Sequence, residues 1–196
     1  VSQKFIQAKK IYFWDIIGLF YDDKKDWHNY LKTINNSISL CQAYKDTAKM
    51  ESYIVKKAGV FLKLGQSNQS FDLLLSRLLL HEKQKNSTYI TDYLREIAEY
   101  YIYFNKYDKA LPYLQKSLKA LQDKKNLNQV VDVLDRLAEV YDFTGHSDSV
   151  LICMYKSIHI IQSIKGVNPQ NYSQVYWRLT SIYTKLQQND SALTYL

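Results

Sequence analysis

The sequence predicts an all-α fold: a right-handed superhelical solenoid of about five antiparallel helix hairpins. Three observations support this prediction. The 196 residues include only five Gly and two Pro, whereas sheets joined by tight turns need more of both. Apolar residues recur at helical spacing along most of the chain. The same pattern returns about every forty residues, and such a two-helix unit buries both of its apolar faces only by stacking on its neighbours.

The repeat is defined by a bulky residue, an apolar residue three positions later, a small residue next to it and then an aromatic residue. The copies are Trp14-Ile17-Gly18-Tyr21, Ile54-Lys57-Ala58-Phe61, Leu94-Ile97-Ala98-Tyr101, Leu134-Leu137-Ala138-Tyr141 and Tyr176-Leu179-Thr180-Tyr183. Their offsets are 40, 40, 40 and 42, and the two extra residues fall in a loop at 165–172. The approximate repeats are 11–50, 51–90, 91–130, 131–172 and 173–196, in a single domain over 1–196.

A second helix follows each aromatic residue after a short polar turn. Its apolar stripe is Ser70-Leu74-Leu78-His81 in the second copy, Ala110-Leu114-Leu118-Leu121 in the third and Val150-Met154-Ile158-Ile161 in the fourth. We expect the small residue of the first helix to lie where the two helices of a hairpin cross closely, because a larger side chain would push the axes apart. Lys57 departs from the apolar pattern, and Arg77 stands where later copies have Ser117 and Ser157.

The segments "WDIIGLFY", "LREIAEYYIYFNKYDKALPYLQKSL" and "LDRLAEVYDFTGHSDSV" resemble the tetratricopeptide repeat family. The resemblance covers 10–196, and the longer period resembles the long-repeat members of the family. It implies a non-catalytic domain that binds a protein or peptide. By analogy with those members, it also implies a sensory or regulatory module of a larger bacterial signalling protein or transcriptional regulator.

The alternative function is a structural scaffold or a homo-oligomerisation module that associates through open ends of the solenoid. The first residue is Val1, and the segment "DSALTYL" stops within an apolar helical pattern. We therefore expect the chain to be part of a longer protein. The compartment stays open between the cytoplasm and a periplasmic sensor domain.

First helices line the groove in a solenoid of this kind, so their residues outside the packing stripe are candidates for ligand contact. The candidates are Arg95, Glu96, Glu99, Asp132, Asp135, Arg136, Glu139, Asp142, Phe143, Trp177 and Arg178. One interpretation is a solvated helix face with i,i+4 ion pairs Arg95–Glu99 and Asp132–Arg136. The other is an acidic strip for a peptide that carries Lys or Arg, with Tyr103, Phe143 and Trp177 as apolar anchors.

The charge distribution argues against nucleic acid in the groove. The whole chain has a net charge of +7, but the candidate groove residues are acidic on balance, and phosphate contact needs concentrated Lys and Arg. Basic residues elsewhere on the surface are typical of an ordinary soluble domain. The alternative, a basic convex face that contacts nucleic acid or an anionic surface, stays open.

The sequence predicts no catalytic residues, no metal site and no cofactor. The segment "HEKQK" begins like a zinc-protease helix, but Lys85 stands where the second His is required. The pair His146 and Asp148 fits a turn between helices better than acid–base chemistry. Cys41 and Cys153 fall in the first and fourth copies, which stacked hairpins would hold far beyond disulfide reach. No apolar run approaches the length of a membrane span.

Overall fold

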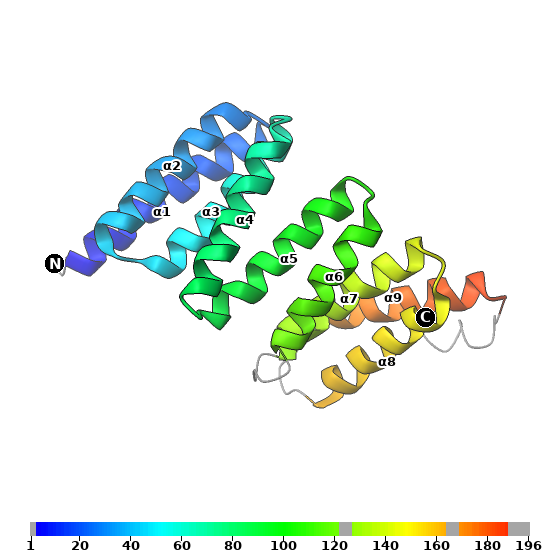
Figure 1. Ribbon diagram of the computed structural model, residues 1–196. Helices are drawn as coiled ribbons and strands as arrows, with labels where there is room; N and C mark the ends of the chain where they lie inside the picture. The colour runs from blue at the N-terminus through cyan, green and yellow to red at the C-terminus, as the bar shows by residue number, and fades with distance from the viewer. Residues whose placement is uncertain (1–2, 122–126, 164–168, 188–196) are drawn as a thin grey trace. The chain divides into compact units, whose positions relative to one another are not determined.

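The computed structural model describes residues 3–121, 127–163 and 169–187. Within these residues the chain forms nine α-helices and no strand, which confirms the all-α prediction (Figure 1). The helices are α1 (Gln3–Asp23), α2 (Trp27–Tyr44), α3 (Thr47–Lys63), α4 (Ser67–Lys83), α5 (Ser87–Tyr103), α6 (Tyr107–Leu121), α7 (Leu127–Phe143), α8 (Ser147–Ser163) and α9 (Pro169–Lys185).

The four described hairpin turns repeat one backbone conformation. The residues with a left-handed backbone are Lys25, Gly65, Asn105 and Gly145, which are forty residues apart. One residue later, a backbone N–H donates to the carbonyl of the repeat's aromatic residue; for example, the Gln66 N–H donates to the Phe61 carbonyl at 2.8 Å. This bond closes the end of the first helix as a Schellman motif does. The conserved spacing of the turns keeps each second helix in the same register against its first helix.

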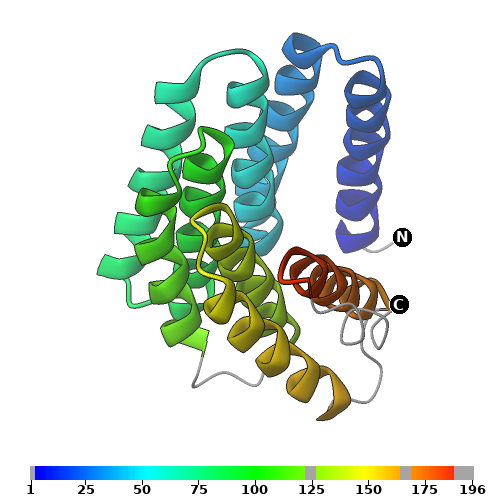
Figure 2. The ribbon, with the colours of Figure 1, turned by 90° about the vertical axis from the view of Figure 1, so that its right-hand side faces the viewer.

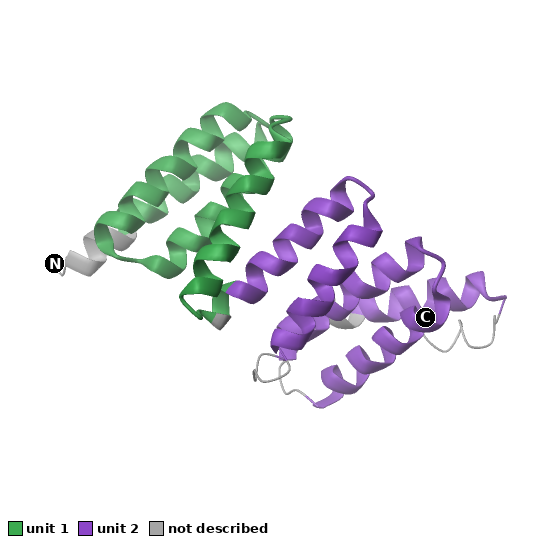
Figure 3. Ribbon diagram, in the orientation of Figure 1, with its two compact units in different colours: residues 1–89 green, residues 90–196 purple. Residues whose placement is uncertain are grey.

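The chain divides into two compact units, residues 1–89 and residues 90–196 (Figure 3). In the first unit, α2 packs between α1 and α3, and α3 also packs on α4 (Figure 2). In the second unit, α7 packs on α6, α8 and α9. The division falls one residue before the boundary expected between the second and third repeats. A single continuous solenoid over 1–196 stays a prediction.

The small residue of the first helix is buried in the first four repeats, as the sequence predicts, whereas Thr180 of α9 is only half-buried. Ala98 and Ala138 are fully buried, and Ala58 is 3% exposed. A Cβ atom at Gly18 would lie 3.1 Å from the Tyr30 ring and 3.5 Å from Thr33 Oγ1, both on α2. The first and second helices of this hairpin therefore approach closely at the predicted position.

The predicted stripe of the second helices is confirmed in α4 and corrected in α6 and α8. All four predicted residues of α4 are buried. In α6 and α8, however, Leu118 and Ile158 are only half-buried, and the preceding Ser117 and Ser157 are fully buried. The interior accepts the small side chain because the facing helix is close: Ser117 Oγ donates to the Thr91 carbonyl at 3.2 Å.

Arg77, which departs from the repeat pattern, takes part in a buried ion pair. Forty residues before Ser117 and Thr91, the second repeat has Arg77 and Glu51. Glu51 is only 3% exposed; Arg77 Nε donates to its Oε2 at 3.2 Å, and Arg77 Nη2 contacts its Oε1. His81 Nε2 lies 3.3 Å from the same Oε1. Arg77 and Glu51 therefore compensate each other's charge.

The second helix predicted for the fifth repeat lies outside the described residues. Of the helices that the structure describes, none is both long enough and apolar enough to cross a membrane.

We expect the same glycine substitution to have opposite effects at two positions in the first unit. Gly18→Leu should lower the free energy of unfolding by roughly 1–3 kcal/mol, because the side chain overpacks the contact with α2. Gly59→Leu is the matched control, since no atom lies within 4 Å of a Cβ at Gly59; it should raise the free energy of unfolding by about 0.5–1 kcal/mol through helix propensity. Urea denaturation measures both values, and equal effects would contradict the close contact.

The Arg77–Glu51 pair should be replaceable by the residues of the third repeat. Arg77→Ser alone should lower the free energy of unfolding by roughly 3 kcal/mol, because it leaves the Glu51 carboxylate buried without its guanidinium. Adding Glu51→Thr should recover most of this loss, since it removes the buried carboxylate and leaves a backbone carbonyl at position 51 that the new hydroxyl at position 77 can use as Ser117 uses the carbonyl of Thr91. A double variant as unstable as the single variant, measured by urea denaturation, would show that the two positions are not coupled in this way.

Candidate functional site

A recess of about 320 Å³ lies in the second unit, on the face formed by α5, α7 and α9. It is lined by Arg95, Glu96, Glu99, Asp132, Asp135, Arg136 and Gln174. The first six of these residues are candidates from the sequence, and the structure brings them together. Gln174 is the residue that the sequence analysis missed. It occupies the position of Asp132 one repeat later, if the two inserted residues at 165–172 are counted, so the register could have identified it.

Ion pairs between neighbouring first helices hold the walls of the recess. Arg136 Nε of α7 lies 2.7 Å from Glu99 Oε1 of α5. Arg178 Nε of α9 donates to Asp135 Oδ1 of α7 at 2.9 Å. Each helix therefore supplies a charged side chain to the next one along the stack.

The local ion pairs predicted from the sequence are not the ones formed. Arg95 pairs with Glu96 at 3.1 Å rather than with Glu99. Arg136 binds Glu99 and, at 2.7 Å, Glu139 rather than Asp132. Two of these pairs form within one helix at other spacings than i,i+4, and the third, Arg136–Glu99, forms because stacking brings a carboxylate of α5 close to α7.

The recess is acidic on balance and partly desolvated. Its lining contains four carboxylates and two guanidinium groups. Burial raises the pKa of Glu99, an effect that the attraction of Arg136 opposes. Burial also raises the pKa of Asp132, and there Arg95 opposes the effect. Among the described residues, Asp132 forms no ion pair within 4.0 Å, so its carboxylate is available to a cationic ligand.

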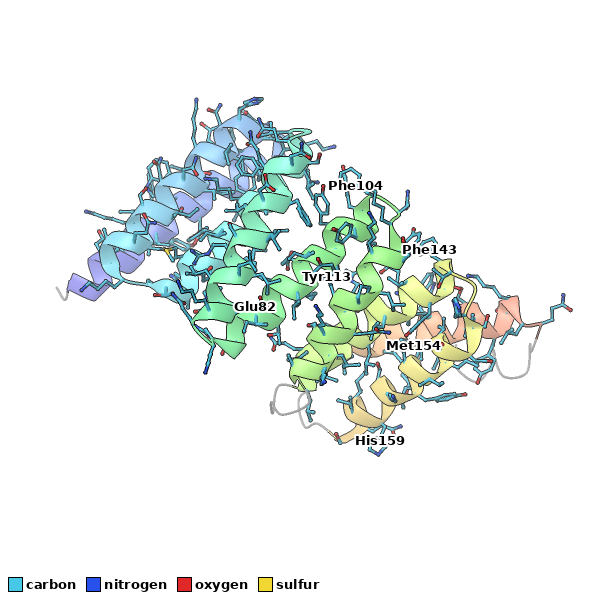
Figure 4. All side chains as sticks on the ribbon, in the orientation of Figure 1. Glu82, Phe104, Tyr113, Phe143, Met154 and His159 are labelled. Atoms are coloured by element: carbon cyan, nitrogen blue, oxygen red, sulfur yellow. The ribbon has the colours of Figure 1, made fainter. Side chains whose placement is uncertain are left out.

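The other predicted residues lie outside the lining of the recess. Glu139 binds Arg136, and Asp142 accepts two hydrogen bonds from Lys185 Nζ, at 2.7 and 2.8 Å. Phe143, labelled in Figure 4, lies at the end of α7 and is 63% exposed. Its ring stacks on that of Tyr107 with 4.7 Å between the ring centroids. Trp177 is 68% exposed. All three predicted apolar anchors, Tyr103, Phe143 and Trp177, are thus exposed.

A second and smaller recess, of about 190 Å³, lies in the first unit between α1, α2 and α3. Its lining is more aromatic and includes Trp14, Tyr30 and Tyr53. Tyr53 donates from its hydroxyl to Asp15 Oδ1 at 2.6 Å, and burial together with this bond raises the pKa of Tyr53. The hydroxyl of Tyr53 therefore stays protonated at neutral pH, and the lining of this recess also contains the charged side chains of Asp15 and Lys56.

The titratable side chains of the described residues do not gather as metal ligands: no group of three or more His, Cys, Asp or Glu is placed to hold an ion. Cys41 and Cys153 are buried free thiols. Burial raises the pKa of Cys153 to about 11, which disfavours the nucleophilic thiolate at neutral pH.

Comparison with known proteins shows the fold but no sequence family. No protein-family model matches the chain, and no curated protein matches it. Among solved structures, BtubC (BKLC) from P. vanneervenii superposes with a TM-score of 0.79 at 12% identity, covering 99% of this chain and 80% of that one. A kinesin light chain from Podosopora anserina with TPR-like repeats gives a TM-score of 0.69 at 11% identity, over 95% and 91% of the two chains.

A third solved structure is the Rap conjugation gene regulator of the plasmid pLS20 in complex with the Phr* peptide. It gives a TM-score of 0.68 at 14% identity, and the match covers 95% of this chain but only 51% of the regulator. Together with the nine described helices, these likenesses show that the chain has a tetratricopeptide-like repeat fold.

The carboxyl group of Glu99 should titrate above its ordinary pKa, and Arg136→Ala should raise this pKa further, because the substitution removes the opposing guanidinium. Because folding raises the pKa of Glu99, the folded state holds this proton more tightly than the unfolded state does. The contribution of Glu99 to stability therefore decreases as pH rises from the unfolded to the folded pKa. Carboxyl ¹³C NMR titration of both proteins measures the shift, and a lower pKa in Arg136→Ala would contradict the account.

Proposed function

We propose that the chain is a non-catalytic, peptide-binding regulatory module, and that its ligand places a Lys or Arg side chain in the recess formed by α5, α7 and α9. The observation that carries this proposal is the composition of the recess: four carboxylates line it with two guanidinium groups, a third guanidinium (Arg178) pairs with Asp135, and one negative charge is left over. A ligand cation would restore the balance of charge in a partly desolvated site, where charge-assisted hydrogen bonds are strong.

The arrangement of the ion pairs supports a preformed site. Arg136 and Arg178 are already engaged by Glu99 and Asp135 on the neighbouring helices. Their positions are therefore fixed before a ligand arrives, which reduces the entropy that binding must overcome. Asp132 is the carboxylate with the fewest partners, so we assign it the main contact with the ligand cation.

An apolar contact beside the recess would add affinity. Trp177 is three residues after Gln174 on α9, so the two side chains lie on one face of the helix. Gln174 lines the recess, and Trp177 is 68% exposed. Exposed Trp side chains often contribute a large share of binding energy at interfaces. The preferred peptide would therefore carry an apolar residue close to its basic residue.

The regulatory role is supported by the repeat architecture that the chain shares with the Rap regulator, which was solved with a bound peptide. The identity is 14%, so the shared feature is the fold, and the ligand chemistry comes from the recess of this chain. The output that the module controls is expected to belong to another part of the same protein, as in a signalling protein or a transcriptional regulator.

Selection from a phage-displayed random peptide library tests the proposal. The wild-type chain should enrich peptides that contain Lys or Arg next to an apolar residue. A synthetic peptide made from the enriched sequence should bind Asp132→Lys at least about ten-fold more weakly, because one charge-assisted contact is worth roughly 1.5 kcal/mol or more. Isothermal calorimetry gives the two dissociation constants.

The matched control is Glu82→Lys, which makes the same charge change on α4, outside the recess (Figure 4). It should leave the affinity unchanged. Enrichment of peptides without basic residues, equal binding by wild type and Asp132→Lys, or equal losses in the two variants would each contradict the proposal.

A further inference from the structure

Helix α1 carries an exposed apolar face. Its side chains Tyr12, Phe13, Ile16, Leu19 and Phe20 are 66%, 58%, 50%, 67% and 58% exposed. Their spacing of i, i+1, i+4, i+7 and i+8 places them on one side of the helix. Contiguous apolar surface of this kind marks an interaction site more often than isolated apolar residues do.

The repeat register shows that part of this face is an interface position. Phe13 and Phe20 correspond to Tyr53 and Val60 in α3, which are 6% and 3% exposed. The equivalent residues of α7 and α9 are also buried, at 0–2% exposure: Val133, Val140, Val175 and Ile182. In those repeats the preceding second helix, which is α2, α6 or α8, packs against the first helix. Helix α1 has the same kind of face, but within the first unit its principal partner is α2 on the other side.

The covering helices share a spacing that α1 itself carries. In α2, α6 and α8 the apolar residues step by four and then three: Ile34-Ile38-Cys41, Leu114-Leu118-Leu121 and Met154-Ile158-Ile161. Tyr12, Ile16 and Leu19 of α1 follow the same steps. This spacing aligns the three side chains in one apolar stripe along α1, which can pack against a partner helix.

The exposed face is also symmetric about Ile16. Tyr12 and Phe20 lie four residues before and after Ile16, and Phe13 and Leu19 lie three residues before and after it. Lys9 and Asp23 lie seven residues away on either side, which is two helical turns, on the same face. Two copies of α1 that run antiparallel would thus place Ile16 against Ile16 and bring Lys9 of each copy to Asp23 of the other.

We propose that this face binds a second copy of the chain, and that the two α1 helices pack antiparallel about a two-fold axis at Ile16. The interface is isologous, so each apolar residue of one copy meets the symmetry-related set of the other. The opposite charges at its two ends select the antiparallel orientation. Since one helix from each copy forms the interface, the dimer is expected to be reversible, with a dissociation constant on the order of micromolar.

Sedimentation analysis of the whole chain over a concentration series tests the dimer. The wild type should shift from monomer to dimer as concentration rises. Ile16→Glu should abolish the shift, because it places two carboxylates on the axis. Ile152→Glu on α8 is the matched control, since Ile152 is 54% exposed, and it should dimerise as the wild type does. A wild type that stays monomeric, or a dimer that survives Ile16→Glu, would overturn the proposal.

Charge reversal tests the orientation of the helices. Lys9→Glu and Asp23→Lys should each weaken dimerisation several-fold, because each places like charges together at both ends of the interface. The double variant should recover the wild-type dissociation constant, since it exchanges the two charges. Additive weakening in the double variant would overturn the antiparallel arrangement.

A cross-link tests the position of the axis and does not depend on affinity. Ile16→Cys should form an intermolecular disulfide on mild oxidation, since residue 16 meets its own copy. Phe20→Cys should cross-link poorly, because residue 20 meets residue 12. The natural cysteines are both buried, and circular dichroism checks that each variant is folded. Faster cross-linking through residue 20 than through residue 16 would overturn the assigned axis.

Discussion

The fold depends on the close approach of two helices at one small residue in each hairpin. Ala98 and Ala138 are fully buried, and at Gly18 even a Cβ atom would lie 3.1 Å from the facing Tyr30 ring. This contact fixes the rotation of each first helix about its own axis. The rotation in turn decides which side chains are buried against the neighbours and which face the open side. The charged recess forms because this rotation turns the charged side chains of α5, α7 and α9 toward the open side.

Elsewhere along the same hairpins, the two packed helices accommodate different polar side chains. In the third repeat, Ser117 donates a hydrogen bond to the Thr91 carbonyl of the facing helix. In the second repeat the two positions hold Arg77 and Glu51, which form an ion pair with Glu51 fully enclosed. A buried charge is costly unless it is paired, so these two residues are interdependent. The repeat geometry is therefore maintained by matching partners rather than by one fixed pair of residues.

Sequence periodicity is sufficient to predict the helices, the small contact residues and six of the seven residues that line the recess, because these follow from register alone. It does not predict the ion pairs. The i,i+4 rule considers one helix, whereas Arg136 binds Glu99 on the helix before it. It also selects Leu118 for the interior in place of Ser117, because hydrophobicity does not report how close the facing helix is. The exposure of Phe13 depends on which helix is present beside it, and periodicity alone does not show that.

The most direct test of the close contact is the free energy of unfolding of Ala138→Leu, measured by chemical denaturation. Leu and Ala have similar helix propensities, so the difference reports the space between the helices. The account predicts a loss of roughly 1–3 kcal/mol, because the added atoms overpack a contact that has no room for them. An unchanged or increased free energy of unfolding would contradict the account, since it would mean that the helices are far enough apart to bury a larger side chain.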